Sequence, residues 1–257
     1  NIPSFEVLND AANSQNAIIT VTPTYTNNGV ECTGPSEIFV LTVNPGAQVN
    51  PIDNQILCDG ESTDPIQFTT LNTDGVTEYN WTNTNTSIGL PSAGTGDIGS
   101  FSVVNTSTSA QSATITVTPT YTNNGVICSG NSEQFTITVN PSAQVNDVTN
   151  YNTILCDGEF TPVYSFTTAN TDGLTSFNWT NNNVAIGLAA SGEGGIPSFQ
   201  VINLTQSTIS ATITVTPSYE NNGIICDGNA ETFTIVVNPS PEMDIVDDII
   251  LCNNEIS

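Results

Sequence analysis

The chain has 257 residues with 25 acidic side chains and no lysine, arginine or histidine, so its formal net charge is -25. Binding to nucleic-acid phosphates or to anionic lipid headgroups relies on cationic side chains, so this composition excludes both as direct partners. It also removes the usual catalytic base, the Schiff-base amine and the guanidinium that clamps a phosphoryl group. We therefore expect no enzymatic function, no catalytic residue and no bound cofactor.

The chain is expected to fold despite its charge. Hydrophobic residues make up 37% of it and fall in alternating runs, which disordered segments lack. No stretch approaches the ~20 consecutive apolar residues of a membrane span, so direct membrane insertion is not expected.

An 18-residue stretch occurs three times, beginning at Ala17, Ala113 and Ala211, and its middle copy reads ATITVTPTYTNNGVICSG. Apolar and threonine side chains alternate along it, as in a half-buried strand rich in β-branched residues. The Asn-Gly pair that follows favours a tight turn. Other landmarks recur at the same spacing of 96 or 98 residues, which is the length of a domain and not of a solenoid turn.

In chain order, residues 1–45 contain only the last strands of such a unit, residues 46–141 and 142–239 are two complete units, and residues 240–257 begin a further one. Asp-Gly, Gly-Thr-Gly and Asn-Gly turn signals separate the strands of the first complete unit. Its strands are predicted near residues 55–58, 66–70, 78–82, 100–104, 113–121 and 133–139.

The unit length and the alternating pattern predict an all-β chain of tandem immunoglobulin-like β-sandwich domains. The connections between units, such as residues 43–51, are short and contain proline. Because such linkers are stiffer than Gly/Ser tethers, we expect an extended, semi-rigid array.

The six cysteines fall into two classes. Cys32, Cys128 and Cys226 follow the Asn-Gly turn, whereas Cys58, Cys156 and Cys252 end the first strand of a unit. Without histidine or a CxxC spacing, zinc is a poor interpretation, and disulfides formed in an oxidising extracellular setting fit better.

Two disulfide connectivities are simple. One joins sequence neighbours across each joint, as Cys32–Cys58, Cys128–Cys156 and Cys226–Cys252. The other closes each complete unit on itself, as Cys58–Cys128 and Cys156–Cys226. A disulfide tolerates Cα separations of only ~7 Å, and in an immunoglobulin-like sandwich the first strand begins at the same end as the loop joining the last two strands. This layout favours closure within the unit.

Trp81 and Trp179 have two interpretations. Exposed aromatic faces could stack on sugar rings, but each tryptophan lies in a Tyr/Phe-Asn-Trp strand that matches the buried tryptophan of an immunoglobulin-like domain. The core position is favoured.

Asp74 and Asp172 are the weak candidates for calcium, because each could offer a carboxylate from an Asp-Gly pair. Their spacing is not that of an EF-hand loop, and Asp-Gly is first of all a turn dipeptide. Turn formation is therefore favoured, with calcium as the minority interpretation.

The recurring glutamates and the asparagines of N-x-S/T motifs are both interpreted as structural and not as functional residues. Glu133 and Glu231 precede the last strand of their units, where an edge charge blocks unwanted strand pairing. Asn80, Asn105 and Asn178 satisfy the N-x-S/T pattern, which arises by chance in a chain rich in asparagine and threonine.

The combination of ILCDGE, NTDG, a Tyr/Phe-Asn-Trp-Thr-Asn strand, ATITVTPTYTNNG and FTITVNP resembles the PKD-like repeats of giant cell-surface adhesins from gliding Bacteroidota. The resemblance covers essentially the whole chain. It implies export through the outer membrane by type IX secretion and an extracellular, cell-surface location. Implied partners are an extracellular surface or a polysaccharide or protein ligand, together with cell-surface motility or secretion machinery.

The function expected from these observations is that of a semi-rigid stalk in a secreted adhesin filament that serves adhesion and gliding motility. Two alternatives remain open. The repeats could form a glycan- or protein-binding module, or they could be accessory repeats of an extracellular enzyme.

Overall fold

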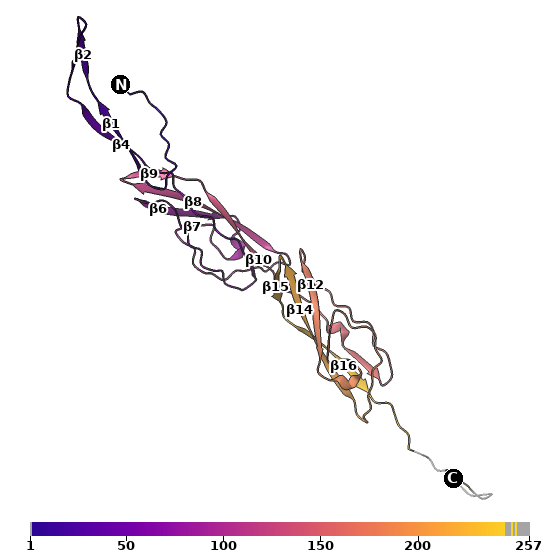
Figure 1. Ribbon diagram of the computed structural model, residues 1–257. Helices are drawn as coiled ribbons and strands as arrows, with labels where there is room; N and C mark the ends of the chain where they lie inside the picture. Colours follow the sequence, from indigo (N-terminus) through magenta and orange to yellow (C-terminus); the bar gives the residue numbers. More distant parts are fainter. Residues whose placement is uncertain (1, 245–247, 249, 251–257) are drawn as a thin grey trace. The chain divides into compact units, whose positions relative to one another are not determined.

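The computed structural model describes residues 2–244, 248 and 250. The described residues form sixteen strands and three short 3-10 turns, without any α-helix, and the chain divides into two compact units after Pro141 (Figure 1). The predicted all-β, sandwich-type fold is confirmed.

Residues 1–45, the partial repeat, form two antiparallel strand pairs. One joins β1 (Gln15–Val21) to β4 (Glu37–Val43). The other is the hairpin of β2 (Thr24–Asn27) and β3 (Val30–Thr33).

Residues 46–141, the first complete repeat, form a six-stranded sheet of order β5-β10-β8-β6-β7, with β9 paired to β8. The β5–β10 pair is parallel and the others are antiparallel. The elements are β5 (Gln55–Cys58), β6 (Val76–Asn83), η1 (Thr86–Ile88), β7 (Ala93–Thr95), β8 (Gln111–Asn123), β9 (Val126–Ser129) and β10 (Glu133–Asn140).

Residues 142–239, the second complete repeat, have the same sheet order, β11-β16-β14-β12-β13, with β15 paired to β14 and a parallel β11–β16 pair. The elements are η2 (Thr149–Tyr151), β11 (Thr153–Cys156), β12 (Leu174–Asn181), η3 (Val184–Ile186), β13 (Ser191–Glu193), β14 (Ile209–Asn221), β15 (Ile224–Asp227) and β16 (Glu231–Asn238). The predicted start of a further unit falls mostly outside the described residues.

The second layer of the first complete repeat is irregular. The strands predicted at 66–70 and 100–104 are wrong, because these segments pair only through the isolated bridges Ile66↔Ile98 and Ser62↔Ser102. The backbone N–H of Phe68 donates to a side-chain oxygen of Asp97 (2.8 Å) instead of to a carbonyl, which ends the ladder there.

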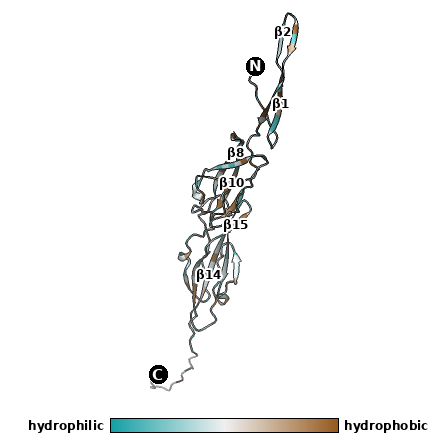
Figure 2. Cartoon of the chain, turned by 90° about the vertical axis from the view of Figure 1, so that its left-hand side faces the viewer, coloured by the Kyte–Doolittle hydropathy of each residue, from teal (hydrophilic) through white to brown (hydrophobic). Residues whose placement is uncertain are grey.

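The core lies between these two layers. Alternate apolar side chains of β8 and β10, among them Ile115, Val117 and Ile137, are fully buried, while the intervening threonines lie on the other face. Apolar residues follow β8, β10 and β14 in the hydropathy view (Figure 2). The period-two pattern of the repeated stretch therefore builds the core as expected.

Tyr164 makes the second complete repeat sensitive to alkaline pH. Its ring is fully buried beside Phe233, with ring centroids 4.9 Å apart, and its hydroxyl bonds to that of Thr153 (3.1 Å). Burial raises the pKa of Tyr164 above its ordinary value. A raised pKa means that the neutral phenol stabilises the fold fully below pH ~10, and that this stabilisation is lost as pH rises through the folded-state pKa.

We therefore expect the free energy of unfolding of the second complete repeat to fall above pH ~10. Urea titrations from pH 7 upward measure it. Tyr164→Phe should weaken this pH dependence without abolishing it, because burial and the nearby Asp172 also raise the pKa of Tyr219. Equal pH dependence in the two proteins would contradict the prediction.

Candidate functional site

The linker that enters each complete repeat is held against the hairpin of that repeat. In the first, Ala47 forms an isolated parallel bridge with Gly130, and a Cβ atom on Gly130 would lie 1.9 Å from the carbonyl oxygen of Ala47. In the second, the equivalent Cβ on Gly228 would lie 1.8 Å from the carbonyl oxygen of Ala143. Only glycine permits the linker carbonyl to come this close to the hairpin. The same glycine contact therefore occurs in both complete repeats.

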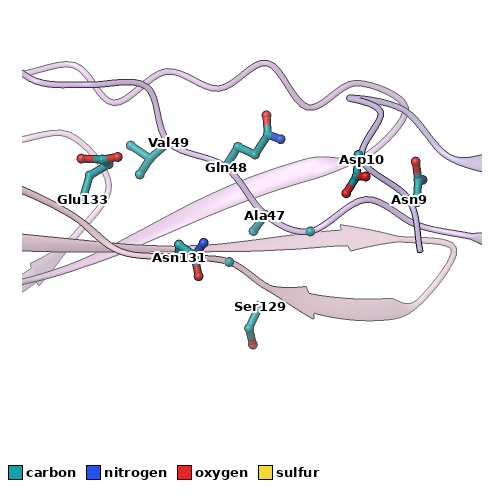
Figure 3. A pocket seen from close by; sticks show the side chains of 10 residues that line it. Asn9, Asp10, Ala47, Gln48, Val49, Ser129, Asn131 and Glu133 are labelled. Atoms are coloured by element: carbon teal, nitrogen blue, oxygen red, sulfur yellow. The ribbon is translucent and has the colours of Figure 1, made fainter. Parts of the chain in front are cut away.

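A shallow polar groove of about 640 Å³, the joint groove, lies beside this bridge. In Figure 3 the side chain of Glu133 lies toward one end of it and those of Asn9 and Asp10 toward the other. The groove is lined by Asn9, Asp10, Gly46, Ala47, Gln48, Val49, Ser129, Gly130, Asn131 and Glu133. A smaller groove of about 420 Å³ recurs in the second complete repeat and includes Glu231.

Asparagine side chains connect the partial repeat to the first complete repeat. The side-chain amide of Asn123, at the end of β8, donates to the hydroxyl of Ser14 (2.6 Å) and to the side-chain oxygen of Asn44 (3.2 Å). In return, the amide of Asn44 donates to the backbone carbonyl of Asn123 (3.2 Å). The backbone N–H of Thr73 adds a bond to the carbonyl of Ala12 (2.9 Å). The hairpin of the first complete repeat therefore contacts the last strands of the partial repeat.

An asparagine recurs in all three copies of the loop before the long strand, buried in the two complete repeats and half-buried in the partial repeat. The side-chain amides of Asn9, Asn105 and Asn203 donate to the carbonyls at the ends of the last strands, those of Val43, Val139 and Val237, at 2.7, 2.7 and 2.8 Å. Sequence reasoning interpreted one of them only as a chance glycosylation motif. Their recurrence at the repeat spacing was the signal that could have identified them.

Asn105→Ala is expected to destabilise the first complete repeat by about 1–3 kcal/mol, because it leaves the carbonyls of Val139 and Ser109 without their side-chain donor. Urea unfolding followed by tryptophan fluorescence measures the change. Asn80→Ala, at an exposed position of β6, should change stability by less than about 0.5 kcal/mol. Similar costs at both positions would contradict the role assigned to Asn105.

The cysteines correct the favoured disulfide prediction. Cys58 and Cys226 are disulfide-bonded, whereas Cys32, Cys128 and Cys156 are free thiols. Closure of each repeat through Cys58–Cys128 and Cys156–Cys226 was therefore wrong. Of the links between sequence neighbours, Cys32–Cys58 and Cys128–Cys156 are also wrong, and Cys226–Cys252 involves a residue outside the described ones.

The parallel pairing of the first and last strands explains the error. Cys58 ends β5 opposite Asn140, at the end of the sheet where β8 begins. Cys128 lies opposite Tyr121, near the other end of β8. About ten residues of strand separate these positions, which is ~33 Å, far beyond the reach of a disulfide.

The two tryptophans belong to the core, as favoured. Trp81 is 7% exposed and Trp179 6%. The ring of Trp81 lies on Gly94 of β7, where a Cβ atom would come within 2.2 Å of it. Its indole N–H donates to the carbonyl of Gly96 (3.2 Å). Neither tryptophan presents a face on which a sugar ring could stack.

The calcium candidates occupy turns. Asp74 and Asp172 have φ values of 67° and 66° and precede glycine. Among the described residues, no three His, Cys, Asp or Glu side chains come together as a metal site. The structure thus gives both aspartates the geometry of turn residues.

The partial repeat exposes the face that is core in a complete repeat. Phe39 of β4 is 46% exposed, whereas the equivalent Phe135 of β10 is 2% exposed. Ile66, Phe68 and Ile98 belong to the cluster around Phe135. Residues 1–45 contain no equivalents of these three side chains. An apolar hollow of about 370 Å³ remains, lined by Ile2, Pro3, Ser4, Phe5, Val7, Ile19, Phe39 and Leu41.

These features define a class of protein: repeated β-sandwich domains in which the entering linker packs on a glycine in the hairpin of its own repeat. Residues 55–143 match the PKD-like domain family, so the first complete repeat is similar to that family. No described helix is long and apolar enough to cross a membrane.

Solved structures similar to the chain include human mucin-like protocadherin EC1-2, at 8% identity and a TM-score of 0.34, covering 76% of this chain and 98% of that one. The FN1-FN3 domains of chicken CNTN1 are 11% identical with a TM-score of 0.27, covering 86% and 76%. The Ig1-2 module of the Drosophila receptor protein tyrosine phosphatase DLAR is 10% identical with a TM-score of 0.20, covering 76% and 100%. No curated protein matches the sequence.

Proposed function

We propose that this chain is a segment of an extracellular adhesion stalk built from PKD-like repeats, without enzymatic activity of its own. The observation that carries the proposal is the repetition itself. Both complete repeats have the same sheet order, the same buried asparagine and the same linker-to-hairpin contact at glycine. The features that recur are therefore those that fold a repeat and hold its entering linker. A protein segment that acts as a spacer needs these features and no binding or catalytic site.

The sheet topology suits a repeat that transmits force. The chain enters the first complete repeat through β5 and leaves through β10, and these two strands are parallel neighbours over four residue pairs. Pulling the two ends apart slides the strands along each other, so that the bonds of the parallel ladder are loaded together rather than one after another. The second complete repeat has the same arrangement in β11 and β16.

An extracellular location agrees with the disulfide-bonded state of Cys58 and Cys226, because disulfides persist in oxidising compartments. The finer proposal is a filament that is exported through the outer membrane by type IX secretion and serves gliding motility. It is supported by the resemblance of the repeat motifs to the adhesins of gliding Bacteroidota. In this proposal the partners are a polysaccharide or protein on an external surface and the motility machinery of the cell.

Single-molecule pulling of the chain in the presence of a reductant tests the stalk function. Each complete repeat should unfold as a separate event that lengthens the chain by roughly 330 Å, the extended length of one repeat less its folded span being of this order. One cooperative rupture of both repeats would contradict independent force-bearing units. So would unfolding without a measurable force peak.

The structure bears on one of the two alternative functions. A glycan-binding module that uses the tryptophan faces is disfavoured by the burial of Trp81 and Trp179. The role of accessory repeats in an extracellular enzyme stays a prediction, which the sequence of any longer protein containing this chain would test.

A further inference from the structure

We propose that Asn28, at the tip of the β2–β3 hairpin, is a site of spontaneous deamidation, and that packing protects the equivalent asparagines of the complete repeats from this modification. The inference does not depend on the stalk function, because it rests on the individual hairpins alone.

The hairpin tip has the same residues and the same geometry in all three copies. The tips are Asn28-Gly29, Asn124-Gly125 and Asn222-Gly223. The asparagines have φ values of 49°, 48° and 52° and the glycines 80°, 77° and 78°, as the two central residues of a type I′ turn require. All three asparagines are exposed, and their side chains have no hydrogen-bond partner among the described residues.

An asparagine that precedes glycine loses its side-chain amide without an enzyme. The backbone nitrogen of glycine attacks the side-chain carbonyl carbon of asparagine, the new C–N bond closes a succinimide ring, and the side-chain nitrogen leaves as ammonia with the proton of the glycine N–H. Water then opens the ring at either carbonyl and gives aspartate or isoaspartate. The ring closes only when the asparagine leaves the regular turn conformation, so the opening of the hairpin controls the rate.

The hairpin of the partial repeat has little packing to keep it closed. Every residue of β2 and β3 is exposed, and the two strands form a two-stranded sheet of their own. Tyr25 of β2 is 69% exposed. A two-stranded hairpin by itself is marginally stable in water, so we expect the tip at Asn28 to open often.

The complete repeats hold the same hairpin in place. Tyr121 and Tyr219, the equivalents of Tyr25, are fully buried. Their hydroxyls donate to the backbone carbonyls of Thr73 (2.5 Å) and Thr171 (2.8 Å). The long strand of each hairpin also pairs with β6 or β12. Opening these hairpins therefore requires the disruption of a packed core.

Asn28 and Asn124 form a matched pair within one chain. Residues 20–30 and 116–126 have the identical sequence TVTPTYTNNGV. The intrinsic reactivity of the two Asn-Gly pairs is therefore the same, and a difference in rate in the folded protein reports the packing. We expect Asn28 to deamidate at least about tenfold faster than Asn124, because the free energy of local opening is small only in the unpacked hairpin.

The product changes the hairpin that forms it. Isoaspartate adds one carbon atom to the main chain, and the register of a hairpin depends on the length of its turn. A two-residue turn that contains isoaspartate no longer fits the pairing of Asn27 with Val30. We therefore expect the β2–β3 hairpin to remain open after this conversion.

The test is peptide mapping after incubation of the folded chain in mildly alkaline buffer. A protease specific for glutamate is used because the chain contains no lysine or arginine, and it places Asn28, Asn124 and Asn222 in different peptides. Fragmentation in the mass spectrometer locates each conversion of amide to acid, with an unincubated sample as reference. We expect conversion at Asn28 and at least about tenfold slower conversion at the other two.

Unfolding supplies the control for intrinsic reactivity. In denaturing urea, Asn28 and Asn124 should convert at equal rates. Equal rates at these two residues in the folded protein, or no conversion at Asn28, would overturn the proposal.

Glycine at the tip gives matched variants, because a Gly-Gly pair also fits a type I′ turn. Asn28→Gly should remove the first acidic species that ion-exchange chromatography resolves during incubation. Asn124→Gly should leave this species in place. If the species persists in Asn28→Gly, or disappears in both variants, a different amide is the site and the proposal fails.

Tyrosine variants test the protection itself. Tyr121→Ala should raise the rate at Asn124 toward that at Asn28, whether the repeat stays folded or unfolds, because the packing that closes the hairpin is lost. Tyr25→Ala should leave the rate at Asn28 unchanged within about a factor of two, since Tyr25 is exposed. An unchanged rate at Asn124 in the Tyr121→Ala protein would show that packing does not protect it.

Discussion

Trp81→Ala is expected to destabilise the first complete repeat by about 3–5 kcal/mol, the range for truncating a buried tryptophan in a core. The substitution removes a ring that is 7% exposed and packed on Gly94, and leaves a cavity beside β7. It also leaves the carbonyl of Gly96 without the indole donor. Because small domains have stabilities of about 5–15 kcal/mol, much of the repeat should be unfolded at moderate urea concentrations.

Urea unfolding followed by far-UV circular dichroism measures this loss. The matched control is Leu71→Ala in the same repeat, since Leu71 is 65% exposed and should cost less than about 0.5 kcal/mol. A Trp81→Ala protein that unfolds like the unsubstituted chain, while losing affinity for a glycan, would restore the binding-platform hypothesis.

The sequence predicts the elements that alternate. β8 is a 13-residue strand in which apolar side chains face the core at every second position. The alternation of apolar residues and threonines in the repeated stretch predicts this arrangement directly. The Asn-Gly turn is equally readable, because Asn124 and Gly125 both have positive φ values, 48° and 77°. Local chemistry decides these features, so one copy of the repeat suffices to predict them.

Features that depend on distant partners were not predictable in this way. Gly94 belongs to a Gly-Thr-Gly run that suggests a turn, yet it lies in β7 because the ring of Trp81 needs the space of its missing side chain. Residues 66–70 alternate as a strand does, but the side chain of Asp97 replaces a ladder carbonyl. The cysteine pairing failed because no local pattern shows that β5 runs parallel to β10.

Gly130→Ala is expected to destabilise the first complete repeat by about 3 kcal/mol, at the upper end of the usual cost of overpacking. The added methyl would lie 1.9 Å from the carbonyl oxygen of Ala47, a backbone atom that cannot move as a side-chain tip can. Relief requires breaking the Ala47↔Gly130 bridge, which holds the entering linker against the hairpin. We expect lower stability together with faster amide hydrogen exchange in residues 46–49, measured by mass spectrometry.

Two alanine substitutions are matched controls for this contact. On the linker, a Cβ at Gly46 would meet only the carbonyl oxygen of Ser129, at 3.9 Å, so Gly46→Ala should be nearly neutral. Gly34 is the equivalent of Gly130 in the partial repeat, and a Cβ there would meet only atoms of Pro23, at 3.0 Å or more. Gly34→Ala should therefore cost far less than Gly130→Ala, although both sequences present the same glycine after the same hairpin. Of these two glycines, Gly130 has a linker packed on it and Gly34 does not. Equal costs at the two positions would therefore show that the glycine is required by its own hairpin and not by the contact with the linker.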